Sequence, residues 1–130
     1  IAQTLLHEIF HTCDLNFDAN DEILAESAAQ ACGFYTPWLG VASPSSGQVG
    51  DTIDVRGLAL GDTQDAGHFL ELGGSPITAY NSWAQNSASG IEISFNIPAS
   101  AAPSGPSHTL DLVAVNNGIR SNVRRVEVLP

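Results

Sequence analysis

The sequence predicts a mainly β protein, with a β-sandwich over residues 37–130 that follows a two-helix segment over residues 1–36. Three observations support this fold class. Apolar residues recur at helical spacing near the start, short alternating segments separated by glycine and proline follow from residue 41 onward, and a stretch with Pro37 lies between the two patterns. We therefore expect two domains, the first of which is the C-terminal helical part of a larger unit.

The two predicted helices are separated by a polar loop over residues 14–21. The second helix, residues 22–32, is rich in alanine and contains neither glycine nor proline, and Gly33 ends it. Asp18 or Asn20 can cap its first turn. The first helix is marked by apolar residues at the spacing of helical turns: Ile1, Leu5, Leu6, Ile9 and Phe10.

The predicted strands lie between turns that contain glycine and proline, at the regular spacing of a β-sandwich. They are residues 52–60, 68–72, 91–98, 109–115 and 122–129. The clearest is residues 91–98, in which apolar and polar side chains alternate throughout. Adjacent Arg124 and Arg125 interrupt the alternation of the last strand, which indicates a bulge or a sheet edge.

The charge and hydropathy of the chain exclude two classes of partner. Four arginines, no lysine and 14 acidic residues give a formal net charge of −10. Such a surface repels phosphate backbones, so we expect no nucleic-acid partner. No apolar run approaches the roughly 20 residues of a membrane-spanning helix, so we expect no membrane span.

The strongest functional motif is His7-Glu8-x-x-His11. Residues four apart lie on one face of a helix, so both imidazoles can bind one zinc ion. Glu8 lies about 100° around the same helix, where it can reach a metal-bound water without ligating the metal. Zinc lowers the pKa of that water to about 7, and Glu8 would accept its proton as the water attacks a carbonyl group. The motif therefore predicts a zinc peptidase that acts on a peptide or protein substrate, with Glu8 as the catalytic base.

A catalytic zinc ion needs a third protein ligand. No histidine lies between residues 12 and 67, which leaves Glu22 and Glu26 on the second predicted helix. The arrangement resembles that of the gluzincin metallopeptidases, in which a glutamate on a following helix completes the site and an acid four residues later supports a histidine. The resemblance implies that His7, His11 and Glu22 are the ligands and that Glu26 supports a histidine. The short link of ten residues between His11 and Glu22 leaves Glu26 open as the ligand instead.

The chain contains two cysteines, Cys13 after the histidine helix and Cys32 at the end of the second helix. A disulfide between them would hold the two predicted helices together. It would also place the protein outside the cell or in a periplasm. Two free buried thiols are the alternative interpretation.

The loop between the predicted helices matches a calcium-binding loop in part. Its alternating oxygen-bearing residues are Asp14, Asn16, Asp18 and Asn20. Ala19 replaces the usual glycine, and Ala25 stands where the bidentate glutamate belongs. Helix capping and turn chemistry explain the same residues, so calcium binding and a structural role both stay as hypotheses.

Residues 40–130 resemble an IPT/TIG domain, an immunoglobulin-like β-sandwich. The opening turns and strand of that family are matched by Ser43, Pro44, Gly47, Gly50, Thr52 and Gly57, with Asp51 between Gly50 and Thr52. Residues 68–77 match the next strand and its Gly-Gly turn, and residues 93–118 match the strand that ends in Ile-Pro and the hairpin after it. The resemblance implies a module that binds, spaces or dimerises and carries no catalytic residues of its own.

These observations together predict the C-terminal part of a secreted zinc metallopeptidase with the sandwich as an accessory domain. Because Ile1 opens directly into a helical pattern, we expect a missing upstream part of the same protein and no peptidase activity from residues 1–130 alone. Two other classes stay open. One is a structural or adhesive extracellular module that self-assembles through its sandwich, and the other is a carbohydrate-binding module with Trp38, Tyr80 and Trp83 as its platform.

Overall fold

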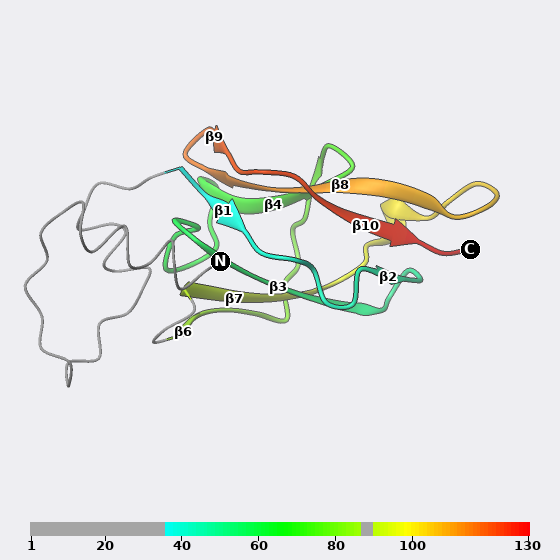
Figure 1. The fold of residues 1–130 in the computed structure, drawn as a ribbon, viewed down its shortest axis with the longest axis horizontal. Coiled ribbons are helices and arrows are strands. Elements are labelled where there is room, and N and C mark those ends of the chain that lie inside the picture. Colours follow the sequence, from blue (N-terminus) through cyan, green and yellow to red (C-terminus); the bar gives the residue numbers. More distant parts are fainter. Residues whose placement is uncertain (1–35, 87–89) are drawn as a thin grey trace, which may run out of the picture.

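The computed structural model describes residues 36–86 and 90–130, which form two packed β-sheets. Figure 1 shows the sheets as two layers along the long axis of the molecule. One sheet has the strand order β1-β3-β7-β6, and the other has the order β2-β10-β8-β4-β5 with β9 beside β8. The elements are β1 (Trp38–Leu39), β2 (Ser46–Gly47), β3 (Thr52–Leu58), β4 (His68–Leu72), β5 (Ser75–Pro76), β6 (Ser82–Asn86), β7 (Gly90–Asn96), the 3-10 turn η1 (Ala99–Ala101), β8 (His108–Asn116), β9 (Ile119–Arg120) and β10 (Arg124–Val128). This mainly β, sandwich-like fold is consistent with an immunoglobulin-like domain.

The predicted fold class is corrected in its helical part. The described residues contain strands and the short turn η1 but no α-helix, so no two-helix segment belongs to the described fold. The prediction of two helices rested on apolar spacing in short segments, and short helices are marginal without packing partners. Residues 1–35, on which those helices were placed, lie outside the described part of the chain.

The five predicted strands are confirmed as β3, β4, β7, β8 and β10, which are the inner strands of both sheets. Their alternation turns one set of side chains into the core, because successive residues of a strand point to opposite faces. In β7, Ile91, Ile93 and Phe95 are each at most 1% exposed. They belong to one cluster with residues of the facing sheet: Leu70, Leu72, Leu112, Ala114, Val126 and Val128. Each large side chain buried in this way stabilises the fold by roughly 1.5–3 kcal/mol.

The two arginines of β10 lie at an edge and not at a bulge. The register of β10 with β8 is continuous from Arg124 opposite Leu112 to Val128 opposite His108. β2 pairs in parallel only with Glu127 and Val128. Within the described residues, the half of β10 that contains both arginines therefore has a strand on one side only.

Trp38 and Leu39 form a strand of the sandwich, although the sequence pattern places them in a linker. β1 pairs with the end of β3. On the other side of β1, the Leu39 N–H donates to Asn122 Oδ1 at 2.8 Å, and Asn122 Nδ2 donates to the Leu39 carbonyl at 2.9 Å. Arg124 Nε donates to the same carbonyl at 2.9 Å. These side chains take the place of a neighbouring strand and connect the two sheets at the point where the chain enters the sandwich.

Candidate functional site

The residues predicted to bind metal lie outside the described part of the chain. They are His7, Glu8, His11, Glu22 and Glu26 for zinc, and Asp14, Asn16, Asp18 and Asn20 for calcium. The predicted disulfide between Cys13 and Cys32 lies outside it as well. Their roles stay predictions from the sequence.

Within residues 36–86 and 90–130, no three side chains of the types His, Cys, Asp or Glu gather closely enough to hold a metal ion. The described part of the chain also contains no helix long and apolar enough to cross a membrane. The functional features of the sandwich are therefore features of its surface.

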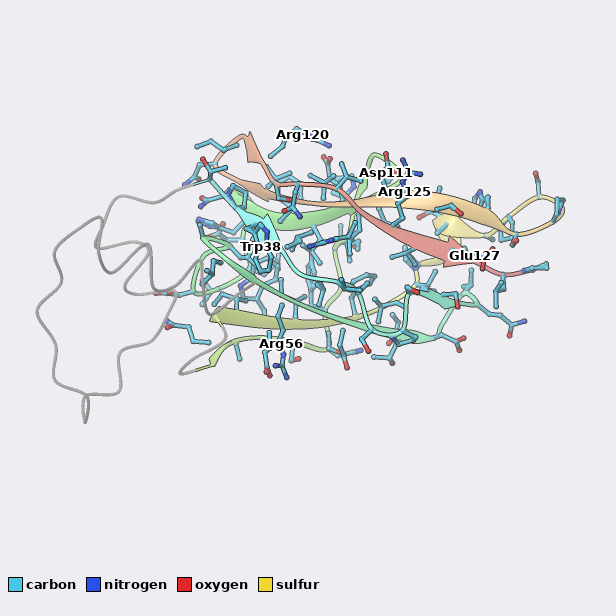
Figure 2. All side chains as sticks on the ribbon, in the orientation of Figure 1. Trp38, Arg56, Asp111, Arg120, Arg125 and Glu127 are labelled. Atoms are coloured by element: carbon cyan, nitrogen blue, oxygen red, sulfur yellow. The ribbon has the colours of Figure 1, made fainter. Side chains whose placement is uncertain are left out.

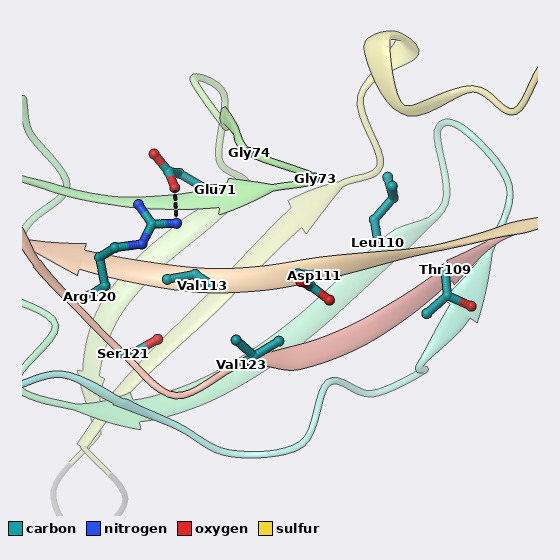
Figure 3. A pocket seen from close by; sticks show the side chains of 10 residues that line it. All are labelled: Glu71, Gly73, Gly74, Thr109, Leu110, Asp111, Val113, Arg120, Ser121 and Val123. Atoms are coloured by element: carbon teal, nitrogen blue, oxygen red, sulfur yellow. Dashed lines mark ion pairs between the residues drawn. The ribbon is translucent and has the colours of Figure 1, made fainter.

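The largest charged feature of the sandwich is an open hollow of about 460 Å³ on the outside of the six-stranded sheet, which we call the outer groove. Figure 2 places Arg120, Asp111 and Arg125 along this sheet, and Arg56 on the opposite side of the molecule. Figure 3 shows the groove from close by. Its lining residues are Glu71, Gly73, Gly74, Thr109, Leu110, Asp111, Val113, Arg120, Ser121 and Val123.

Strand alternation presents the charged residues of the outer groove. Asp111 and Val113 lie two apart on β8, and Glu71 of β4 is directly opposite Val113 in the register. Arg120 of β9 reaches back so that its guanidinium lies 2.6 Å from the Glu71 carboxylate. The Glu71 side chain is 15% exposed and that of Arg120 is 57% exposed, so this ion pair is partly shielded from water. Arg125 lies 3.8 Å from Asp111 in a more exposed pair.

The chemistry of the outer groove suits binding and not catalysis. Both of its carboxylates, Glu71 and Asp111, lie near an arginine, and none of its lining residues is a histidine or cysteine. Exposed ion pairs such as Arg125–Asp111 contribute at most about 1 kcal/mol to stability. The groove therefore offers paired charges, hydroxyl groups and the exposed side chain of Val123 to a ligand.

The two histidines of the sandwich each have a local partner. His68 Nδ1 lies 2.8 Å from Asp65 Oδ1, which also accepts the Gly67 N–H at 2.8 Å. The hydrogen bond with His68, followed by that from Gly67, lowers the pKa of the Asp65 carboxyl group. His108 Nε2 lies 2.7 Å from the Ala101 carbonyl. Both contacts are local and connect loops to strands, which explains the two residues without a metal.

The aromatic residues named for a carbohydrate platform do not share a plane. Tyr80 and Trp83 meet edge to face, with ring centroids 5.3 Å apart and an interplanar angle of 88°. Both pack against the core, and Trp83 Nε1 donates to the Gly61 carbonyl at 2.9 Å. Trp38 lies instead near Arg124, whose guanidinium carbon is 5.9 Å from the ring centroid. This arrangement favours packing as the role of Tyr80 and Trp83.

Sequence reasoning did not find the outer groove, because the groove depends on register between strands. The outward positions of the strands over residues 68–72 and 109–115 could have been listed from alternation alone. That Arg120 folds back onto Glu71 follows from the Asn117-Gly118 turn, where both residues have positive φ, +49° and +87°. In comparisons with known proteins, no family model matches this chain, and no curated protein matches it.

Proposed function

We propose that this chain is part of a secreted zinc metallopeptidase, in which residues 37–130 form an accessory sandwich of the IPT/TIG type. The observation that carries this proposal is the motif His7-Glu8-x-x-His11. Two imidazoles followed by the carboxylates of Glu22 and Glu26 are the donor types that zinc takes in catalytic sites. A bound zinc ion would supply an activated water, and Glu8 would accept a proton at its carboxylate.

The sandwich supports the accessory role through its chemistry. Its described carboxylates do not form a metal cluster, and the histidines His68 and His108 are occupied by local contacts. The turns behind the IPT/TIG resemblance are used as turns: Gly73 and Gly74, with φ of +62° and +84°, connect β4 to β5. Such positions favour glycine because other residues are strained there. The sandwich can therefore position or space the catalytic part without contributing to the reaction.

The first experiment measures metal content and hydrolysis in the intact protein. Wild-type protein should hold about one zinc per chain by elemental analysis, as a single three-ligand site implies. His7→Ala/His11→Ala should lose the zinc, whereas Glu8→Gln should keep zinc and lose hydrolysis of a peptide substrate. A matched control, His68→Ala/His108→Ala, also removes two histidines and should keep both zinc and activity. Full zinc occupancy in the His7→Ala/His11→Ala protein would contradict the proposal.

The same assay distinguishes the two candidate third ligands. Replacing the ligating glutamate with glutamine should weaken zinc binding more than replacing the supporting one, because outer partners of a metal site typically change affinity by about 10–100-fold and a ligand by more. The gluzincin resemblance predicts the larger loss for Glu22→Gln and the smaller for Glu26→Gln. The reverse order would assign the ligand to Glu26.

A structural or adhesive module is the second candidate. It is favoured by the outer groove, because a surface with paired charges and no catalytic groups is suited to contact and not to chemistry. This candidate predicts an intact protein without zinc and without hydrolytic activity, so the metal assay separates it from the first.

A further inference from the structure

The edges of the two sheets differ in how well they are protected. Natural sheets shield their edge strands by keeping them short, by placing proline or charge on them, or by covering them. β1, β2 and β5 are each two residues long, β5 contains Pro76, and β1 is covered by Asn122. β6 is the remaining edge of the described sandwich, and it is five residues long.

β6 has none of the usual protective features in its sequence. Ser82–Asn86 contains no proline and no charged residue, and the uncharged stretch extends from residue 73 through residue 91. β7 lies on one side of β6, and no strand of the described part lies on the other side. Figure 1 shows β6 at the outer margin of its sheet.

The structure also holds β6 rigidly in place from its inner face. Trp83 packs on the core, stacks edge to face on Tyr80, and donates from Nε1 to the Gly61 carbonyl. The adjacent residues Ser82 and Ala84 are exposed. An edge that is already ordered loses little conformational entropy when a partner strand is added.

We propose that β6 is an association edge and that its partner is β6 of a second copy of this chain. The two strands pair antiparallel about a two-fold axis at Ala84, which brings Ala84 opposite Ala84 and extends the four-stranded sheet across both copies. A two-fold axis makes the contact close on itself, so that a dimer forms and not a filament. Ala84 at the axis provides the smallest side chain of the strand where two identical side chains meet.

Charge favours this edge over the other surfaces of the molecule. The chain has a formal net charge of −10, so two copies repel each other at most approaches. Strand addition at β6 brings uncharged residues into contact and places no pair of like charges directly opposite each other. Five paired residues bury less than the roughly 1,200–2,000 Å² of a stable interface, so the dimer is weak, depends on protein concentration and strengthens as added salt screens the repulsion.

The test is sedimentation equilibrium of residues 1–130 over a range of concentrations. The wild-type mass should rise with concentration from 13.6 kDa toward twice that value. Ala84→Lys should weaken the association by at least about tenfold, because two ammonium groups then meet across the axis. The new lysine lies opposite Glu92 within its own chain, which favours the folded monomer, and circular dichroism should show an unchanged fold.

Two control variants make the result specific. Ala84→Gln has a side chain of comparable reach without charge and should associate within about threefold of wild type. Ala102→Lys makes the same change in net charge at an exposed site away from β6, and should associate at least as well as wild type. A wild-type chain that stays at 13.6 kDa up to millimolar concentration would overturn the proposal. So would a dimer that survives Ala84→Lys but is lost in Val123→Lys, because the contact would then lie at the outer groove.

Discussion

The hydroxyl group of Tyr80 connects two parts of the six-stranded side of the sandwich. It accepts the N–H of Leu70 in β4 at 2.8 Å and donates to the carbonyl of Ile77 at 2.8 Å. Burial of the ring raises the pKa of Tyr80 to about 12. A single phenol therefore satisfies two backbone groups that would otherwise be buried without partners.

This pKa shift predicts how stability depends on pH. The unfolded chain loses the phenolic proton near pH 10 and the folded chain near pH 12, so ionisation favours the unfolded state in between. The contribution of Tyr80 to the free energy of unfolding is fully present below about pH 10 and should be lost as the pH rises to about 12. Because the chain has no lysine, few other groups titrate in this window. Urea unfolding measured from pH 8 to 12 checks the prediction.

Tyr80→Phe separates the hydroxyl group from the ring. The variant should be less stable at neutral pH by about 1–3 kcal/mol, because the Leu70 N–H and the Ile77 carbonyl lose their partner. It should also lack the fall in stability between pH 10 and 12. Tyr35→Phe, which changes the other tyrosine, should leave the fall in place; a Tyr80→Phe protein that keeps the wild-type pH dependence would contradict the assignment.

At the scale of elements, Gly57 decides whether β1 can join its sheet. Gly57 lies opposite Leu39 on one side and Ile91 on the other. A methyl group at this position would overlap the Trp38 carbonyl oxygen and lie 2.9 Å from Leu60 Cδ1. The strand can therefore carry no side chain there without moving β1.

Gly57→Ala should lower the free energy of unfolding by at least about 2 kcal/mol, in the range measured for overpacked cores. The matched control is Gly105→Ala, because a Cβ at Gly105 meets no atom within 4 Å. That control should change stability by less than about 0.5 kcal/mol. Denaturant midpoints of the three proteins provide the comparison, and equal midpoints would show that β1 adapts to the extra methyl.

Elements with a one-sided apolar pattern were predictable from the sequence, and elements defined by distant contacts were not. β7 was predicted because alternate residues from Ile91 to Phe95 are all large and apolar. β6 contains Trp83 as its one large apolar residue, so no alternation marks it. β1 depends on Asn122 and Arg124, more than 80 residues away, and no local pattern can reveal such a partner.

The candidate site divides in the same way. The zinc motif is a local pattern, so His7, Glu8 and His11 were found at once as hypotheses. The outer groove was not found, because Glu71 and Arg120 are far apart in the sequence and meet only through the pairing of β4, β8 and β9. The two predicted helices rested on periodicity alone, which is the weakest of these signals for short segments.

At the scale of the whole molecule, the sandwich contains one continuous apolar core made from both sheets. Such a core can fold without further domains, so residues 37–130 expressed alone should unfold in one cooperative transition. Phe95→Ala in that fragment should cost about 3–5 kcal/mol, because it opens a cavity at a fully buried site. Calorimetry of the fragment and of residues 1–130 checks this prediction. A broad, non-cooperative melt of the fragment would show that the sandwich needs the rest of the chain.

The chain enters the sandwich at β1 and leaves it after β10, toward opposite ends of the long axis (Figure 1). A pulling force applied between these two points would act along β1, nearly at right angles to the hydrogen bonds that join it to β3. Those bonds would have to break together in shear, and the contacts of Asn122 and Arg124 with Leu39 would have to break with them. The clamp on Leu39 therefore makes the sandwich resistant to stretching, a useful property for a domain through which tension passes from one part of a protein to the next.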